Sequence, residues 1–333
     1  MRRLRYISIL VCLVAIGFFV WQNAPHYRII SGEIFGTFYK IKIRTDKKDK
    51  ELQNKIKAEL EDVNKQMSVF EPESDVSKIN RLPAGKQIKL TPDMQIVLSA
   101  MRQVWQQTDG RFDPTLAPLI ELWGFGTDKN RRTPTDKEIK QALRSVGVDK
   151  LTLKKDILTK KNAKTALNLS AIAKGYGVDK VAALLDKEGY QNYVVEIGGE
   201  VKAKGTRAEN GDFWSIGVNR PMKGSAENML VLSMENLAAA TSGNYRNFYE
   251  QDGKAYAHTM SSKTGRPVQT DVLSATVFHP SCMYADAYAT SLMVFGVADG
   301  LAFADKYQLP VILIDTAFEM HFSKAAEDLF GEP

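Results

Sequence analysis

The chain has 333 residues, of which 44% are hydrophobic and 25% are charged, and its formal net charge at pH 7 is +6. These fractions are ordinary for a globular protein and exclude an intrinsically disordered chain. Much of the positive charge comes from four arginines near the N-terminus, Arg2, Arg3, Arg5 and Arg28. The remainder is weakly basic and has no basic stripe with interleaved aromatic residues, so we expect no nucleic-acid partner. Two cysteines far apart, Cys12 and Cys282, exclude a disulfide framework and a zinc cluster.

The N-terminal residues 1–24 are predicted to be a signal or membrane anchor. Three arginines precede an uncharged, mostly apolar run over residues 6–21. As a helix this run would be about 24 Å long, shorter than the roughly 30 Å bilayer core, so a secretory signal and a short uncleaved anchor are both open. Ala24 is followed by Pro25, a poor cleavage site, and we therefore favour the anchor. Either way we expect residues 25–333 to be exported, to the periplasmic or extracytoplasmic face of the cytoplasmic membrane.

A strand and an amphipathic helix are predicted next. The strand covers residues 31–44, and Phe35-Gly36-Thr37 interrupts it where a glycine indicates a bulge or a close backbone approach. The helix is marked by apolar residues at helical spacing, Leu52, Ile56, Leu60, Val63 and Met67. Residues 68–80 are predicted to form a polar loop.

Two further helices have clear start signals. Thr91-Pro92 supplies an N-cap and a proline at the first helical position, and Asp109-Gly110 ends that helix. Thr135 and Glu138 form a capping box for a short helix, which a hairpin over residues 151–158 follows. Between the two helices, residues 122–126 are rich in aromatics and glycine. Such a segment either packs a turn against the core or forms the wall of an aromatic ligand site.

Residues 168–180 form the stretch around which the chain is organised. Residues 166–169 are predicted to end a short strand, and a helix is predicted from Val178 until Gly189. Between them lies a corner with two glycines, and Lys174 adds a positive charge to the free N–H groups of the helix start. This combination suits a phosphate or a pyrophosphate. The alternative is a tight corner with a solvated lysine.

The second half alternates strands and polar turns. Strands are predicted over residues 193–197, 214–218, 229–232, 272–278 and 311–315, with polar turns at 241–245 and 258–265 and a glycine corner at Gly198-Gly199. A helix over residues 283–295 places Asp286 and Thr290 on one face. Their oxygens suit a hard cation such as Mg²⁺, although an aspartate near a helix start can also merely favour the helix dipole. His258 lies in a polar turn, where a histidine is more often a surface residue than a catalyst.

In their order along the chain, these stretches resemble the FAD:protein FMN transferase family, also called ApbE. The resemblance spans nearly everything after the anchor. It rests on Gly36-Thr37-Phe38-Tyr39, Met67-Ser68-Val69-Phe70 with Ser77 and Asn80, Phe112-Asp113-Pro114-Thr115, Leu122-Trp123-Gly124-Phe125-Gly126, Ala171-Ile172-Ala173-Lys174-Gly175-Tyr176, Glu196-Ile197-Gly198-Gly199, Thr241-Ser242-Gly243-Asn244-Tyr245, His258, Thr264-Gly265 and Ala285-Asp286-Ala287-Tyr288-Ala289-Thr290.

The resemblance implies an α+β fold with a single catalytic domain, built from mixed sheets and flanking helices. It also implies an Mg²⁺-dependent transferase that moves FMN from FAD to a threonine or serine of an acceptor protein and releases AMP. The acceptor would be a protein such as a subunit of a membrane redox complex. By resemblance the magnesium ligands are Asp286, Thr290 and the main-chain carbonyl of Ala171. The residues in FAD-contacting positions are Phe35, Phe70, Arg111, Phe112, Asp113, Asn168, Lys174 and Met260, and His258 is the candidate catalytic base.

The chain departs from the family pattern at three places. Phe35 stands where many members have methionine, Asn168 stands where aspartate is common, and Ser261-Ser262 replaces an acidic or amide residue and a proline after His258. Two other functions stay open. One is Mg²⁺-dependent hydrolysis of FAD to FMN and AMP, for which the same metal and pyrophosphate contacts would serve, and the other is flavin binding without turnover by an exported protein. The metal-binding pattern and His258 count against a pure binding protein, which has no need of a metal at the scissile bond.

Overall fold

The computed structural model describes residues 26–127, 131–222, 224–225, 227–244, 248–251 and 254–331. The expected anchor over residues 1–24 lies outside these ranges. Within them, none of the helices combines the length and the apolar character needed to span a bilayer.

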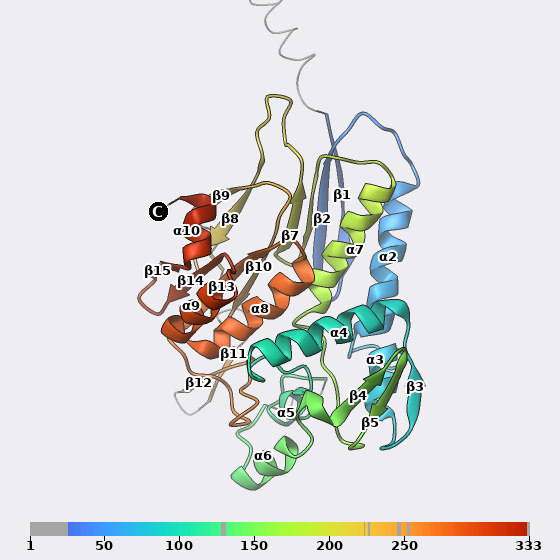
Figure 1. Ribbon diagram of the computed structural model, residues 1–333, viewed down its shortest axis with the longest axis vertical. Coiled ribbons are helices and arrows are strands. Elements are labelled where there is room, and N and C mark those ends of the chain that lie inside the picture. Colours follow the sequence, from blue (N-terminus) through green and yellow to red (C-terminus); the bar gives the residue numbers. More distant parts are fainter. Residues whose placement is uncertain are drawn as a thin grey trace, which may run out of the picture.

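An eight-stranded sheet runs through the centre of the molecule (Figure 1). Its strands, in spatial order, are β1 (Tyr27–Ile34), β2 (Thr37–Arg44), β6 (Tyr193–Ile197), β7 (Glu200–Lys204), β10 (Ala238–Gly243), β13 (Val272–His279), β14 (Val311–Asp315) and β15 (Met320–Phe322). Every neighbouring pair among these strands is antiparallel. The expectation of mixed sheets is therefore wrong, because tight turns such as those between β1 and β2 and between β6 and β7 join antiparallel neighbours.

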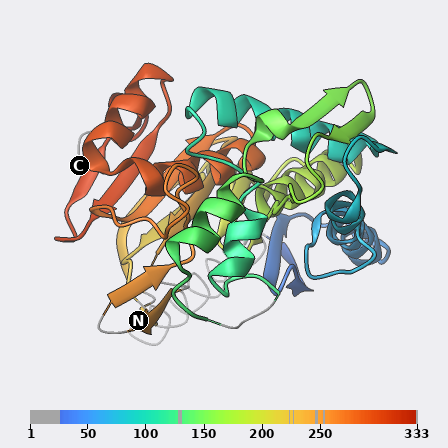
Figure 2. The same cartoon turned by 90° about the horizontal axis from the view of Figure 1, so that it is seen from below.

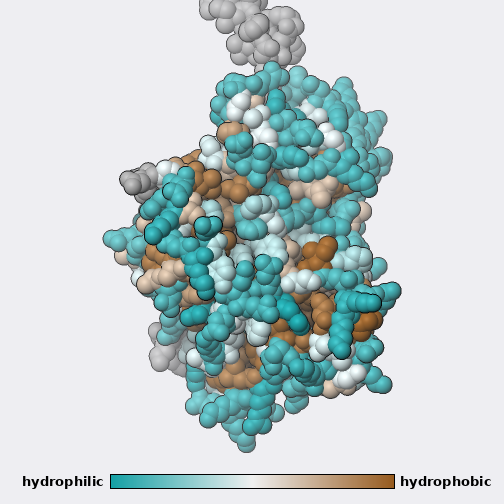
Figure 3. Space-filling model, in the orientation of Figure 1, coloured by the Kyte–Doolittle hydropathy of each residue, from teal (hydrophilic) through white to brown (hydrophobic). Residues whose placement is uncertain are grey.

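The two faces of this sheet are covered differently. Helices α7 (Ala173–Lys187) and α8 (Cys282–Phe295) pack on one face, with α2 (Leu52–Met67) and α4 (Pro92–Gln107) outside them (Figures 1 and 2). The hairpin of β8 (Trp214–Asn219) and β9 (Asn228–Met234) packs on the opposite face. Because side chains alternate along a strand, neighbouring residues such as Ala239 and Ala240 belong to different cores. Figure 3 shows the helix side as mostly hydrophilic, with several small hydrophobic patches.

Smaller elements surround this framework. They are α3 (Asp75–Arg81), β3 (Gln87–Lys89), α5 (Ala117–Leu122), α6 (Asp136–Leu143), a 3₁₀ turn (Val148–Lys150), β4 (Leu151–Lys154), β5 (Ile157–Lys160), β11 (Phe248–Gln251), β12 (Lys254–Ala257), α9 (Val297–Lys306) and α10 (Lys324–Phe330).

The predicted helix starts are confirmed where a capping residue begins the helix. The Thr91 hydroxyl accepts a hydrogen bond from the Met94 N–H at 3.2 Å, and α4 begins at Pro92. Thr135 and Glu138 form both hydrogen bonds of the predicted capping box at the start of α6. The hairpin of β4 and β5 is also confirmed, as are strands β6, β8, β9, β13 and β14 and helix α8.

Two predictions near the N-terminus are wrong. The strand predicted over residues 31–44 is a hairpin, because Phe35 and Gly36 both adopt positive φ, +54° and +71°, and reverse the chain. The loop predicted over residues 68–80 contains α3, whose N-cap Ser74 accepts a hydrogen bond from the Ser77 N–H.

Three corrections concern segments that later prove important. Residues 166–169 form no strand, only an isolated bridge at Ala166. Helix α7 begins at Ala173 rather than at Val178, so Gly175 and Gly177 lie inside its first turns. The polar turn predicted over 241–245 is in its first three residues the end of β10, an inner strand of the sheet. The last two segments make long-range contacts, α7 with α8 and β10 with β13, which local propensity does not include.

Candidate functional site

A cavity of about 350 Å³ opens beside the start of α7 and the middle of α8. Its lining comes from segments that are far apart in the sequence: Phe70, Arg111, Phe112, Asp113, Pro114, Leu116, Ile120, Phe125, Asn168, Ser170, Ala171, Lys174, Gly198, Glu200, Thr241, Ser242, Gly243, His258, Thr259, Met260, Asp286, Thr290 and Val294. All the site residues predicted from the sequence are among them except Phe35. The structure thus brings the predicted site residues from both halves of the chain together in one cavity.

Phe35 lies outside this lining. It forms the hairpin turn between β1 and β2, and its ring packs on α7, where a Cβ at Gly177 would come within 2.9 Å of the Phe35 ring. The side chain is half-buried between the two cores on the helix side of the sheet. Its structural role is therefore to seat the hairpin on the helix that carries Lys174.

Asp286 is the most deeply enclosed charge in the cavity, with 2% of its side chain exposed. Its Oδ2 accepts a hydrogen bond from the Gly175 N–H at 3.0 Å, and its Oδ1 lies 3.5 Å from Lys174 Nζ. This contact requires α7 and α8 to approach very closely. A Cβ at Gly175 would lie 2.3 Å from the carbonyl oxygen of Cys282, so only glycine fits between the helices.

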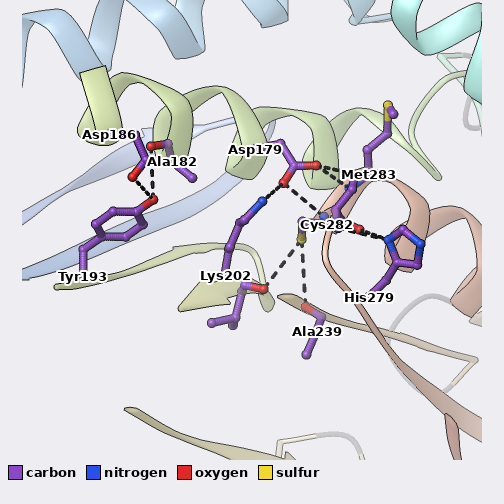
Figure 4. Close-up of polar contacts among 11 residues, drawn as sticks. Asp179, Ala182, Asp186, Tyr193, Lys202, Ala239, His279, Cys282 and Met283 are labelled. Atoms are coloured by element: carbon purple, nitrogen blue, oxygen red, sulfur yellow. Dashed lines mark hydrogen bonds and ion pairs between the residues drawn. The ribbon is translucent and has the colours of Figure 1, made fainter. Parts of the chain in front are cut away.

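Asp179, four residues after Gly175 on α7, fixes this close approach (Figure 4). Its carboxylate accepts hydrogen bonds from the N–H groups of Cys282 and Met283, at 3.1 and 3.0 Å, and from the hydroxyl of Ser281 at 2.6 Å. Lys202 of β7 pairs with the same carboxylate at 2.8 Å. A side chain of α7 therefore caps the start of α8 and ties both helices to the sheet.

Lys174 bridges two buried carboxylates. Its Nζ lies 3.0 Å from Glu200 Oε1, on the first residue of β7, and the second Glu200 oxygen has no hydrogen-bond partner among the described residues. Burial raises the pKa of Glu200 to about 7, with Lys174 opposing the shift and Asp286 adding to it. Burial would lower the pKa of Lys174, but the Asp286 and Glu200 carboxylates outweigh it and raise this pKa instead. The ammonium group is therefore held charged.

Other residues supply oxygen atoms to the lining of the same cavity. Thr290 Oγ1 lies 3.1 Å from Ser242 Oγ on β10, and Ala171 lies in the turn that leads into α7. A carboxylate, a hydroxyl and a main-chain carbonyl are the ligand types of a hard divalent cation such as Mg²⁺. The donor set of Asp286, Thr290 and Ala171 therefore fits the predicted metal.

The other part of the cavity is apolar and aromatic. Phe112, Leu116 and Met260 are buried there, whereas 62% of Phe70 is exposed. Asp113 is buried under this part, where burial raises its pKa although it accepts a hydrogen bond from the Thr115 N–H at 2.8 Å. The cavity thus places an aromatic compartment next to one that contains the Lys174 ammonium group and several oxygen atoms.

The predicted residues Arg111 and Asn168 also line the cavity. The Arg111 guanidinium lies over the Phe295 ring, 4.2 Å from its centroid, and 3.7 Å from Asp299. The Asn168 side chain accepts a hydrogen bond from the Ser170 N–H at 3.0 Å, which shapes the turn before α7. Aspartate at this place would accept the same bond, so the departure at Asn168 changes the charge and keeps the turn.

The loop after His258 is ordered despite its unusual serines. The Ser261 N–H donates to the Arg266 carbonyl at 2.9 Å, and the Ser262 hydroxyl donates to the Gly110 carbonyl at 2.6 Å. The Trp123 indole N–H donates to the Gly265 carbonyl at 3.0 Å. The loop is therefore tied to the aromatic segment and to the end of α4, with His258 exposed at the cavity.

Comparison with known proteins places the chain in a family. The ApbE family model matches residues 35–313. The chain belongs to the ApbE family. It is 37% identical over 303 residues to the FAD:protein FMN transferase of Vibrio cholerae, covering 89% of this chain and 90% of that protein. It is 35% identical over 336 residues to the FAD:protein FMN transferase of Haemophilus influenzae, covering 97% of both.

The solved ApbE structures share the fold. The apo form of the flavinyl transferase ApbE from Pseudomonas stutzeri superposes with a TM-score of 0.85 at 33% identity, covering 93% of this chain and 98% of that chain. The α+β architecture described above is therefore the ApbE fold.

Glu200 is a charged residue of this ApbE cavity that was not predicted from the sequence. It follows the glycine corner Gly198-Gly199 at the start of a strand, and a charged residue at such a place is expected to be exposed to solvent. Only the pairing of β7 with β6 and β10 turns its side chain toward Lys174. A carboxylate directly after a double-glycine turn was the one signal available.

Proposed function

We propose that this chain transfers FMN from FAD to the hydroxyl of a threonine or serine in an acceptor protein, in an Mg²⁺-dependent reaction that releases AMP. The observation that carries this proposal is the two-part cavity. Its aromatic compartment suits an isoalloxazine ring, and its charged compartment suits a pyrophosphate. The names of the ApbE relatives, which state FMN transfer from FAD to protein, support the same reaction.

The charged compartment would hold the reacting phosphates. Asp286, Thr290 and the Ala171 carbonyl would hold Mg²⁺, which when bound neutralises the phosphate oxygens and stabilises the charge of the transition state. Lys174 would add a second positive charge on the phosphates, kept in place by Glu200. The Gly175 N–H fixes the orientation of the Asp286 carboxylate before any ligand arrives.

His258 would act as the general base. A hydroxyl is a weak nucleophile at neutral pH, and a positioned base that takes its proton typically contributes about 10²–10⁴-fold. The acceptor oxygen forms a bond to the FMN phosphorus, the bond from that phosphorus to the bridging oxygen breaks, and AMP leaves. An exposed histidine at the cavity suits this role, because the acceptor must enter from solvent.

Incubation with FAD and Mg²⁺, with and without a purified acceptor domain, tests the proposal. Mass spectrometry of the acceptor should show one FMN phosphoester on a threonine or serine, together with AMP in solution. Free FMN and AMP with an unmodified acceptor would favour the pyrophosphatase. Bound FAD without turnover would identify a flavin-binding protein.

The same proposal includes a location. We place the body on the periplasmic or extracytoplasmic side of the cytoplasmic membrane, anchored through residues 6–21, where a subunit of a membrane redox complex would be a fitting acceptor. The basic flank and the poor cleavage site at Ala24-Pro25 support this placement. Intact-mass analysis of the purified chain should find the N-terminal run retained, and a mature N-terminus beyond Trp21 would refute the anchor.

A further inference from the structure

A second and larger cavity, of about 500 Å³, lies on the opposite face of the main sheet. Its lining residues come from the sheet and from the β8–β9 hairpin: Tyr27, Lys40, Lys42, Val194, Glu196, Gly199, Val201, Arg207, Trp214, Ser215, Ile216, Gly217, Asn219, Ala239, Thr241 and Thr276. We call it the sheet-face groove. Nothing in the proposed chemistry uses it.

The sheet-face groove adjoins the first cavity at one place. Gly198 lines the first cavity, Gly199 lines the groove, and Thr241 lines both. These residues belong to the β6–β7 turn and to the end of β10. A polypeptide segment passing over this turn would therefore reach from the groove to the compartment that contains Asp286.

The charge of the groove is predominantly positive. Lys40, Lys42 and Arg207 line the groove with a single carboxylate, that of Glu196, and Arg207 also pairs with Asp212, outside the lining, at 2.9 Å. The two lysines therefore carry the positive charge of the groove. Lys42 is held in place over aromatic rings, with its Nζ 3.9 Å from the centroid of Tyr27. The ligand of such a groove would be acidic.

Apolar side chains flank the groove on the outer strands. Phe38 is 54% exposed and Ile29 is 57% exposed. The register of β1 and β2 pairs Ile29 with Lys42, and Phe38 lies two residues before Lys40, so both point to the same face as the groove lysines. Exposed aromatic and aliphatic groups beside fixed charges are typical of surfaces that contact proteins.

We propose that the sheet-face groove docks the acceptor protein, binding an acidic segment adjacent to the residue that receives FMN. This inference rests on the proposed function. A lone hydroxyl offers little to recognise, so selection of one acceptor requires contacts outside the reacting residue. The groove supplies these contacts and leads over the β6–β7 turn to the reaction site.

Reversing one exposed charge tests the docking. Lys40→Glu is compared with Lys57→Glu, which changes an exposed lysine on α2, on the helix side of the sheet. With FAD, Mg²⁺ and the acceptor domain as substrates, Lys40→Glu should raise the KM for the acceptor about three- to tenfold, as expected when attraction between exposed charges becomes repulsion. The kcat at saturating acceptor and the affinity for FAD should not change, and Lys57→Glu should behave as wild type. Raising the ionic strength should reduce the difference in KM between Lys40→Glu and the wild type.

Chemical blocking gives an independent test. In a Cys12→Ser background, Lys40→Cys and Lys57→Cys are labelled with a polyethylene glycol maleimide, while buried Cys282 stays unlabelled. Blocking at position 40 should abolish transfer to the acceptor and leave FAD binding intact, whereas blocking at position 57 should affect neither.

The outcomes separate the inference from the function on which it rests. Failure of the wild type to modify the acceptor would refute the proposed function. Transfer by the wild type, with an unchanged KM for Lys40→Glu and normal transfer by the blocked Lys40→Cys variant, would refute docking. Loss of FAD affinity in either position-40 variant would show a small-molecule site instead. Failure of the maleimide to label the Lys40→Cys variant in the full chain would overturn docking and assign the groove to the chain's own N-terminal residues.

Discussion

Gly175→Ala is the substitution for which the geometry gives the sharpest expectation. The new Cβ would lie 2.3 Å from the Cys282 carbonyl oxygen, 2.7 Å from its carbon and 2.9 Å from Asp286 Cβ. The first two atoms belong to the backbone and cannot rotate away, so α7 and α8 must separate. Overpacking of this kind costs about 1–3 kcal/mol, with a backbone clash at the upper end, and the higher helix propensity of alanine returns up to about 1 kcal/mol. We expect a net loss of about 2 kcal/mol in the free energy of unfolding.

The variant should therefore unfold roughly 3 °C below the wild type in calorimetry, because the entropy of unfolding is about 2.1 cal/mol/K per residue. The substitution should also weaken Mg²⁺ binding. Separation of the helices lengthens the hydrogen bond from the Gly175 N–H to Asp286, which measures 3.0 Å, so the Mg²⁺ concentration for half-maximal FAD turnover should rise several-fold.

Gly300→Ala in α9 is the matched control. Its Cβ would have only side-chain atoms as its three nearest neighbours, at 3.1 Å from Leu313, 3.3 Å from Leu292 and 3.7 Å from Phe295, so the change in melting temperature should be small. If Gly175→Ala had the melting temperature and the Mg²⁺ dependence of the wild type, the close contact between α7 and α8 could not be what positions Asp286.

Three further outcomes are expected. Asp286→Ala should lose most activity, and Asp286→Asn should need more Mg²⁺ than the wild type; near wild-type turnover by Asp286→Ala at low Mg²⁺ would contradict the metal assignment. His258→Ala should bind FAD nearly normally and transfer FMN slowly in single-turnover assays, whereas weak binding with unchanged transfer at saturating FAD would end the general-base proposal. His279 Nδ1 accepts a hydrogen bond from the Ser281 N–H at 3.0 Å, and burial lowers its pKa. Because the unfolded chain binds the proton more readily, the free energy of unfolding should fall as the pH drops below about 6.5, and His279→Asn should flatten this dependence in urea titrations at pH 7, 6 and 5. An equal pH dependence of the free energy of unfolding in the wild type and in His279→Asn would show that another group is responsible for it.

Elements with a local cause could be predicted from the sequence. Helices α4 and α6 begin where their capping residues, Thr91 and Thr135, stand. The candidate site could be assembled only through the family resemblance, because its parts are too far apart in the chain for periodicity to connect them. That resemblance groups Asp286, Lys174 and Met260, and all three line one cavity.

Segments determined by distant partners could not be predicted correctly. Thr241, Ser242 and Gly243 are polar and small, which indicates a turn, yet they end an inner strand because they pair with residues 274–276 of β13. Gly175 and Gly177 indicate a corner, yet they lie inside α7, where α8 and the Phe35 ring leave no room for a Cβ and therefore require glycine. Glu200 was missed for the same reason, since only the folded sheet buries it.

The strand order has a consequence for how the chain is made. Strands β1 and β2 leave the ribosome early, but their partner β6 follows only after the whole stretch from Thr45 to Asn192. At about 5–20 residues per second this interval is on the order of ten seconds, and an isolated hairpin is at best marginally stable in water. For most of that interval Ile41 and Ile43, which end with no exposure to solvent, lack the residues of α7 with which they later share a core. Lys40 and Lys42 alternate with these isoleucines, and such charges disfavour the edge-to-edge association of nascent strands.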